Sequence, residues 1–395
     1  MFSEKVINNL SSASWIRAMF EQGELLRQKY GAENVFDFTL GNPDALPPEA
    51  VQKKLVELVS GNYPEIHKYM ANAGYMDVRT KIAQYTSKET GVQVNAENVL
   101  MVSGAAGGLN VIFKALLNPG DEVIAITPFF PEYKFYVDNH GGKIVLVPSL
   151  KDIFQLDICA IEKAITSNTK AIILNSPNNP SGAVYNRESL DKLACVLKNK
   201  ELEIGSQIYV ISDEPYVKLV YDNTVVPPVL SIFKNSIIVN SFSKSLSLPG
   251  ERIGYIAINP AIKDADLLMS AMIFCNRTLG YVNAPSLFQK VIADNLDLVA
   301  GVDKYKERRD ELYKIITEAG FKCELAKGAF YLFVKSPIEN DGEFAKDALT
   351  YNLIVVGGTG FGTSGYFRLA YCVSMETIKK SKSAFNALGK KYGLV

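Results

Sequence analysis

Short runs of apolar, β-branched residues recur along the chain, and several are separated by segments with apolar positions at helical spacing. Such runs are typical of strands that are buried on both faces of a parallel sheet. Helices are predicted between several of them, including residues 107–117 and 187–199. We therefore predict an α/β fold with a mostly parallel, doubly wound sheet. The predicted strands are VLMV from Val99, EVIAI from Glu122, KIVLV from Lys143, AIILN from Ala171, IYVIS from Ile208 and SIIVN from Ser236.

The pattern differs at the two ends of the chain. Residues 1–45 form a short arm with one helical stretch, 14–30, and a turn at G-N-P-D from Gly41. From about residue 290, a charged helix centred on KYKERRDELYKII leads to shorter strands and a final helix near 375–392. We predict a large domain over 46–289 and a smaller α+β domain over 290–395, with the arm 1–45 packing against the small domain.

Composition excludes several classes of protein. The 395 residues contain 42 basic and 42 acidic side chains, so bulk charge does not favour nucleic acid or an anionic membrane as a partner. The start, MFSEKVINNL, lacks the pattern of a secretory signal, and no apolar run is long enough to span a bilayer. The five cysteines are far apart, which favours free thiols in the cytoplasm. The two histidines, His67 and His140, give little support to a metal site.

The most informative segment is S-F-S-K-S-L-S-L-P-G-E-R-I-G, from Ser241 to Gly254, directly after a predicted strand. Lys244, followed eight positions later by Arg252, suits a Schiff-base lysine beside an anion-binding arginine. The spacing alone is weak, because most lysines are simply solvated. Three other strand ends carry motifs that also have ordinary explanations, as a turn, a helix cap and a glycine-rich helix start. They are N-S-P-N-N-P-S-G from Asn175, S-D-E-P-Y from Ser212 and V-S-G-A-A-G-G from Val102.

In their order along the chain, these motifs resemble those of the class I/II, fold type I aminotransferases. The resemblance to the aspartate aminotransferase-like members extends over nearly the whole chain. It implies a homodimeric enzyme that uses pyridoxal 5′-phosphate, held by Lys244 as an aldimine. The reaction would move an amino group from an L-amino acid to a 2-oxo acid, with Lys244 carrying the α-proton. No metal, nucleic acid or membrane partner is expected.

The resemblance also implies roles for individual residues. Beside Lys244, the catalytic residues would be Asp213, which pairs with the ring nitrogen, and Tyr216, which donates to the phenolic oxygen. Arg368 would clamp the substrate α-carboxylate in bidentate fashion. The other expected cofactor-binding residues are Ser103, Gly104, Ala105, Ala106, Phe130, Asn179, Ser241, Ser243, Arg252 and, from the partner subunit, Tyr69. The other expected substrate-binding residues are Gly41, Asn175, Asn179, Arg277 and Trp15, with Arg17 as a further candidate.

Substrate choice and reaction type stay open at this point. Ala106 occupies the place where one group of aspartate enzymes has a lysine, while Arg277 lies where others have an arginine, so acidic, aromatic and neutral substrates are all compatible. Carbon–sulfur lyases and decarboxylases share the scaffold. A cofactor-sensing regulator is disfavoured, because the arm is too short for a DNA-binding module. G-F-G-T-S-G, from Gly360, matches a dinucleotide motif, but a strand-like segment follows where a helix is needed.

Overall fold

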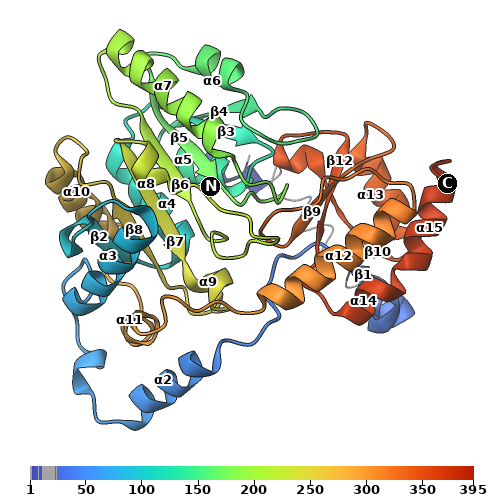
Figure 1. Cartoon of the computed structure of the whole chain (residues 1–395), viewed down its shortest axis with the longest axis horizontal. Helices are drawn as coiled ribbons and strands as arrows, with labels where there is room; N and C mark the ends of the chain where they lie inside the picture. The colour runs from blue at the N-terminus through green and yellow to red at the C-terminus, as the bar shows by residue number, and fades with distance from the viewer. Residues whose placement is uncertain (1, 8, 11–22, 24) are drawn as a thin grey trace. The chain divides into compact units, whose positions relative to one another are not determined.

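A computed structural model describes the chain except for residues 1, 8, 11–22 and 24, and Figure 1 shows it. It divides into two compact units. Unit 1 comprises Met1–Asn42, Asp303–Ala326 and Phe330–Val395, and unit 2 comprises Pro43–Val302 and Lys327–Ala329.

A seven-stranded sheet forms the centre of unit 2, in the order β2-β8-β7-β6-β5-β3-β4 (Figure 1). Neighbouring strands are parallel except for β8, which runs antiparallel to both β2 and β7. The predicted α/β class with a mostly parallel sheet is confirmed, and a strand is present at each of the six predicted runs. The strands are β2 (Val99–Val102), β3 (Glu122–Thr127), β4 (Lys143–Pro148), β5 (Thr169–Asn175), β6 (Tyr209–Asp213), β7 (Ser236–Ser241) and β8 (Gly254–Ile258).

Helices cover both faces of this sheet. Side chains alternate along each strand, and apolar residues therefore point to both faces and need to be covered. On β3, Val123 and Ala125 pack with α4, α5 and α10, whereas Ile124 and Ile126 pack with α6 and α7. The elements of unit 2 outside the sheet are α2 (Glu49–Ser60), η2 (Pro64–His67), α3 (Met76–Thr90), η3 (Ala96–Asn98), α4 (Gly104–Leu116), α5 (Glu132–Asn139), α6 (Ile158–Ala164), α7 (Arg187–Ile204), α8 (Val229–Ile232), α9 (Phe242–Ser245), α10 (Ala265–Thr278) and α11 (Ser286–Ala293).

Unit 1 holds a three-stranded antiparallel sheet, β11-β12-β9, and a short parallel pair, β1-β10. Its core contains the ring contacts of Phe321 with Phe344, Phe367 and Phe385. Its elements are η1 (Ala32–Asn34), β1 (Phe36–Asp37), α12 (Val302–Glu318, whose first residue is assigned to unit 2), β9 (Tyr331–Lys335), α13 (Asp341–Leu349), β10 (Leu353–Ile354), β11 (Val356–Gly357), η4 (Gly358–Phe361), β12 (Tyr366–Ala370), α14 (Met375–Lys380) and α15 (Lys382–Lys391).

Several details differ from the sequence-based expectations. The run from Lys143 was predicted to be a buried strand, but β4 is one of the two edge strands and is partly exposed. Strand β8 was not predicted. The single final helix is divided at Ser381 into α14 and α15. Of the predicted helix 14–30, residues 23 and 25–30 are helical, and the rest lies outside the described residues.

The division between the units falls at 302/303, later than the 289/290 boundary expected from the pattern. The reason is that α11 belongs to unit 2, where Val291 and Ile292 pack in a cluster with Val78 and Ile82 of α3. The chain returns to unit 2 for residues 327–329, where Lys327 N–H donates to the carbonyl of Gly182 over 3.0 Å. Within the described residues, no helix is both long enough and apolar enough to span a bilayer.

Candidate functional site

Polar side chains gather where the central strands of unit 2 end. Asn175, the last residue of β5, pairs in register with Asp213, the last residue of β6, and Asp213 pairs with Val239 of β7. Ser241 ends β7 and pairs with Gly254 at the start of β8. Because the carboxyl ends of parallel strands share one edge, three separate sequence motifs meet there, as is common for ligand sites in open α/β sheets.

Asp213 is the buried acid of this edge, with only 5% of its surface exposed. One carboxylate oxygen, Oδ2, accepts a hydrogen bond of 2.5 Å from the hydroxyl of Tyr133. The other, Oδ1, is buried and has no hydrogen-bond partner among the described residues. Burial raises the pKa of Asp213 to about 6, and the hydrogen bond from Tyr133 opposes that rise. An acceptor in this state calls for a donor or cation from a ligand.

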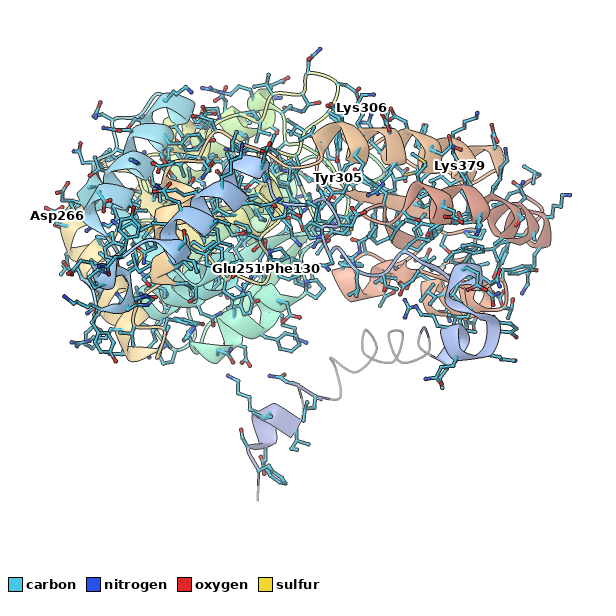
Figure 2. All side chains as sticks on the ribbon, turned by 90° about the horizontal axis from the view of Figure 1, so that it is seen from below. Phe130, Glu251, Asp266, Tyr305, Lys306 and Lys379 are labelled. Atoms are coloured by element: carbon cyan, nitrogen blue, oxygen red, sulfur yellow. The ribbon has the colours of Figure 1, made fainter. Side chains whose placement is uncertain are left out.

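Tyr133 is a site residue that the sequence-based expectations missed. It lies on α5, 80 positions before Asp213, and is almost fully buried. Its ring makes an edge-to-face contact with Phe130, at a centroid distance of 5.5 Å. Phe130, on the loop before α5, is labelled in Figure 2. Burial raises the pKa of Tyr133 well above its usual value, with further contributions from Asp213 and Tyr216, so Tyr133 keeps its proton and donates a hydrogen bond to the carboxylate.

Asn175 holds the neighbouring loop in place. Its amide nitrogen donates to the backbone carbonyl of Asp213 over 2.9 Å, and its amide oxygen accepts from the backbone N–H of Asn179 over 2.8 Å. Asn175 and Asn179 are both buried. These contacts give Asn175 a positioning role within the fold, although we expected it near the substrate carboxylate.

Arg252 and the amino end of α4 form a second polar group at this edge. Nη1 of Arg252 donates to the backbone carbonyl of Pro249 over 2.9 Å and lies 3.4 Å from the hydroxyl of Ser243. Nη2 lies so close to Gly104 that a Cβ there would sit 2.5 Å from it, and the φ of +70° at Gly104 also favours glycine. A Cβ on Gly254 would lie 3.1 Å from the backbone of Gly104, so glycine at position 254 lets these two segments pack closely.

The first turn of α4 contains only small residues, Gly104, Ala105, Ala106 and Gly107, and Ser103 precedes it without a side-chain cap. Backbone N–H groups at such a helix start bind anions, because they lack partners within the helix. An arginine pressed against the same turn adds a full positive charge. Together these groups form a site suited to a phosphate.

Lys244 lies in α9, the single helical turn that directly follows β7. It is half-buried, whereas Ser241 and Ser243 beside it are buried. Tyr216, three residues after Asp213, is also buried, and its phenol contributes to the raised pKa of Tyr133. Unit 2 therefore brings Asp213, Tyr216 and Lys244 to neighbouring strand ends.

Other predicted residues lie apart from this group. Tyr69 is 94% exposed on the loop before α3. Arg277 is exposed near the end of α10, with its guanidinium 5.6 Å from the ring centre of Phe274. Trp15 and Arg17 lie outside the described residues.

Gly41 and Arg368 belong to unit 1. Nη2 of Arg368 donates to the backbone carbonyl of Thr39 over 2.5 Å. A Cβ on Gly41 would lie 1.9 Å from the hydroxyl oxygen of Tyr331, so this position requires glycine. Arg368 and Gly41 therefore both lie next to Tyr331 of β9 and to Thr39, which follows β1.

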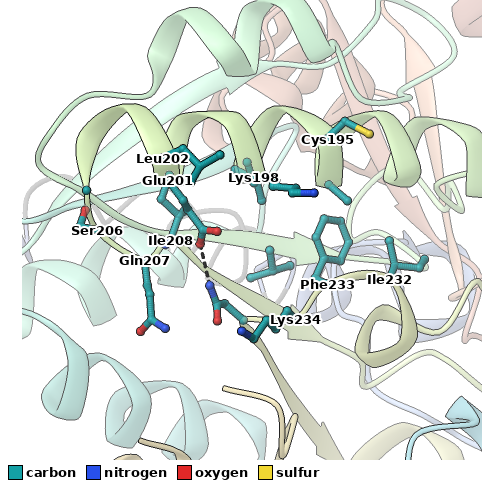
Figure 3. A pocket seen from close by; sticks show the side chains of 15 residues that line it. Cys195, Lys198, Glu201, Leu202, Ser206, Gln207, Ile208, Ile232, Phe233 and Lys234 are labelled. Carbon is teal, nitrogen blue, oxygen red and sulfur yellow. Dashed lines mark hydrogen bonds between the residues drawn. The ribbon is translucent and has the colours of Figure 1, made fainter. Parts of the chain in front are cut away.

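A cavity of about 720 Å³ lies at the opposite edge of the same sheet (Figure 3). It is lined by residues of α7, the start of β6 and the loop before β7, including Cys195, Lys198 and Phe233. Glu201 accepts a hydrogen bond of 2.7 Å from Asn235 there. None of the expected site residues lines it, so we assign the candidate site to the carboxyl ends of the strands.

Comparison with known proteins decides the family. The profile of the family described as "Aminotransferase class I and II" matches residues 33–385. This chain belongs to that family. The aspartate/prephenate aminotransferase of Thermus thermophilus is 32% identical over 352 residues, covering 88% of this chain and 89% of the relative. A probable N-acetyl-LL-diaminopimelate aminotransferase of Bacillus subtilis is 30% identical over 355 residues, covering 88% and 87%.

Solved aminotransferase structures share the fold. An aminotransferase from Eubacterium rectale matches with a TM-score of 0.96 and 41% identity, covering 99% of each chain. The Thermus thermophilus aspartate aminotransferase, solved with maleate, matches with a TM-score of 0.83 and 28% identity, covering 94% of this chain and 96% of that one. The chain is thus a fold type I transaminase, and transaminases of this family depend on pyridoxal phosphate.

The aminotransferase residues at the strand ends fit this cofactor. The unpartnered, buried Oδ1 of Asp213 suits the ring nitrogen, which must be protonated to accept electrons. Arg252 and the glycine-lined start of α4 suit the phosphate. Lys244 supplies an amine in α9, directly after β7, and β7 is the strand next to the one that ends in Asp213.

Proposed function

We propose that pyridoxal 5′-phosphate binds at the carboxyl ends of β5, β6 and β7, with its ring nitrogen on Asp213 and its aldehyde carbon on Nζ of Lys244. The phosphate binds Ser103, Gly104, Ala105, Ala106, Ser241, Ser243 and Arg252. Phe130 covers the ring, and Asn179 and Tyr216 bind its phenolic oxygen. The single observation that carries the proposal is Oδ1 of Asp213, a buried acceptor without a partner among the described residues.

When bound, the cofactor supplies an aldehyde that condenses with amines and a protonated ring that accepts an electron pair from the substrate Cα. The protein side of the reaction is divided among a few groups. Asp213 holds a proton on the ring nitrogen. Nζ of Lys244 would take the proton from the substrate Cα as general base and later give it back as general acid. Arg368, with Gly41, binds the α-carboxylate and orients the substrate.

The proposal is tested by reconstituting the protein with pyridoxal phosphate and screening amino donors against 2-oxoglutarate and pyruvate. We expect a coloured enzyme, a borohydride-reducible adduct on Lys244, and amino-group transfer that requires a 2-oxo acid. Release of ammonia and pyruvate without an acceptor would instead indicate a lyase. A protein that forms no adduct would contradict the proposal.

A homodimer in the cytoplasm completes the proposal. Tyr69 is almost fully exposed in its own chain, which supports its expected role at the partner's phosphate. The five cysteines form no disulfide with one another, and Cys159 and Cys195 are exposed, which supports a reducing compartment.

Replacing Tyr133 with phenylalanine is expected to weaken cofactor binding by about tenfold at pH 7, the size of one hydrogen bond to a charged group. The hydroxyl lowers the pKa of Asp213, so its loss moves that pKa above about 6. More of the carboxyl is then protonated near neutrality, and the fall of affinity toward acid pH begins at a higher pH. Titration of the apoprotein with pyridoxal phosphate from pH 5 to 8 measures both effects.

The matched control is Tyr221→Phe. Tyr221 is also buried, but its hydroxyl donates to the backbone carbonyl of Ala329, over 2.5 Å. An equal change of the pH profile in both variants would mean that Tyr133 acts on stability and not on Asp213.

Arg277→Ala tests whether the substrate side chain is acidic. If Arg277 binds a side-chain carboxylate in the dimer, the variant raises KM for aspartate and glutamate about tenfold and leaves KM for phenylalanine unchanged. Steady-state kinetics with the three donors measure this. Arg187→Ala is the control, since Arg187 is an exposed arginine paired with Asp191 on α7. Unchanged kinetics for both acidic donors would exclude this role.

A further inference from the structure

The glycine-rich segment 357–365 in unit 1 includes the G-F-G-T-S-G pattern from Gly360, and its Phe361 contacts Arg368. The segment includes η4, which ends at Phe361. The guanidinium carbon of Arg368 lies 4.8 Å from the ring centre of Phe361 and 4.7 Å from that of Tyr331 on β9. Both distances are within the range of cation–π attraction. Arg368 therefore has two aromatic contacts in addition to its hydrogen bond to Thr39.

Phe361 can hold Arg368 in place only if its own loop is rigid, and Asp341 provides that rigidity. Asp341, the first residue of α13, is 2% exposed. Its Oδ2 accepts hydrogen bonds from the backbone N–H of Thr359 over 3.1 Å, from the Thr359 hydroxyl over 2.7 Å, and from the backbone N–H of Gly365 over 3.1 Å. One carboxylate oxygen thus ties both ends of the loop together.

The glycines of this loop are explained by the same packing. A Cβ on Gly357 would lie 2.4 Å from Oδ1 of Asp341, and one on Gly358 would lie 2.3 Å from the carbonyl oxygen of Thr363. Phe361 is 1% exposed and also makes an edge-to-face contact with Phe333 of β9, at 6.2 Å. The loop therefore has little room to move while Asp341 is in place.

We propose that Phe361 and Asp341 are positioning residues for Arg368: Phe361 acts by direct contact, and Asp341 acts at a distance by fastening the loop that carries Phe361. The proposal rests on the proposed function, in which Arg368 binds the substrate carboxylate. A guanidinium held in one orientation binds a carboxylate with two parallel hydrogen bonds, whereas a mobile one loses part of that affinity.

Kinetics of the holoenzyme with its best amino donor form the first test. We expect Phe361→Leu and Asp341→Ala to raise KM about three- to tenfold, with kcat within twofold, because one cation–π contact is lost or misplaced. Asp341→Asn keeps an acceptor at Oδ2 and is expected to restore most of the affinity. With the decarboxylated amine of the same donor, the variants are expected to match the wild type, because Arg368 then has no carboxylate to bind.

A double-mutant cycle separates this role from a structural one. In an Arg368→Ala background, Phe361→Leu is expected to have no further effect on KM. Phe344→Leu is the matched control, because Phe344 is equally buried in unit 1 but packs against Phe321 and Phe367. A KM effect of Phe361→Leu that is independent of Arg368, or that Phe344→Leu reproduces, would overturn the proposal.

A second readout does not depend on turnover. In protein labelled with 15N-arginine, the Nε–H signal of Arg368, assigned with Arg368→Lys, is expected to show an aromatic ring-current shift. Phe361→Leu and Asp341→Ala should reduce that shift, and Phe344→Leu should not. An unchanged signal in Phe361→Leu would contradict the proposed contact. If the wild type transfers no amino group, the proposed function fails, while this measurement still decides whether Phe361 and Asp341 position Arg368.

Discussion

Lys244→Ala is expected to lower turnover at least a thousandfold and to remove the borohydride-reducible adduct. Two roles disappear together, since in the proposed function the same Nζ binds the aldehyde carbon and moves the α-proton. Proton transfer by a positioned side chain alone contributes about 10²- to 10⁴-fold. The measurements are single-turnover kinetics with the best donor and mass spectrometry of the reduced protein. The Cα proton of the donor should also no longer exchange with solvent at an appreciable rate.

Lys218 makes a demanding control for this prediction. Burial lowers its pKa to about 8, which by itself would suggest a reactive lysine. Its Nζ, however, donates to the backbone carbonyl of Leu296 and lies over the ring of Tyr85, at 4.6 Å. We expect Lys218→Met to keep near-normal turnover. Loss of the adduct in that variant, together with its survival in Lys244→Ala, would contradict the site assignment.

Asp213→Asn is expected to lower turnover and cofactor affinity by about 100-fold or more. The substitution keeps the size and the acceptor but removes the charge that stabilises a protonated ring. Leaving one member of a buried ion pair without its partner costs about 3–5 kcal/mol. Equilibrium titration of the apoprotein with pyridoxal phosphate measures affinity, and the absorbance of the bound cofactor reports its protonation.

The control for Asp213 is the next residue in the chain. Glu214 is a half-buried acid, with a pKa raised by burial to about 7, and its Oε1 accepts a hydrogen bond of 2.7 Å from the hydroxyl of Ser212. Glu214→Gln changes the charge at a neighbouring position without touching Oδ1 of Asp213. We expect an effect below tenfold. Equal losses in the two variants would show that buried charge in general, and not the ring contact, is responsible.

The local sequence was sufficient to predict most strands and the residues at their ends. A strand buried on both faces needs an uninterrupted apolar run, so β3, β5 and β7 are visible in the sequence without knowledge of their partners. Polar residues directly after parallel strands must meet at one edge of the sheet. Asp213 and Ser241 therefore could be assigned to one site before the fold was known.

Partners distant in sequence could not be predicted in the same way. Tyr133 donates to Asp213 across 80 positions, and no local pattern distinguishes it from other buried tyrosines. The amide nitrogen and the amide oxygen of Asn175 likewise form hydrogen bonds with the backbones of Asp213 and Asn179. These bonds depend on which strands pair. The dinucleotide-like pattern that includes Phe361 contacts Asp341 and Arg368, and these contacts are not visible in the pattern itself.

By itself, the sequence determined the α/β class with a mostly parallel sheet and the polar residues that follow the predicted strands, because these depend on local periodicity and on residues adjacent to strand ends. Only the tertiary structure decided that β4 is an edge strand, that α11 belongs to unit 2, and which oxygen of Asp213 is left for a ligand. These features depend on which elements pack together. Such packing is decided by burial and hydrogen bonding between segments far apart in the chain, and a local sequence pattern contains no information about these contacts.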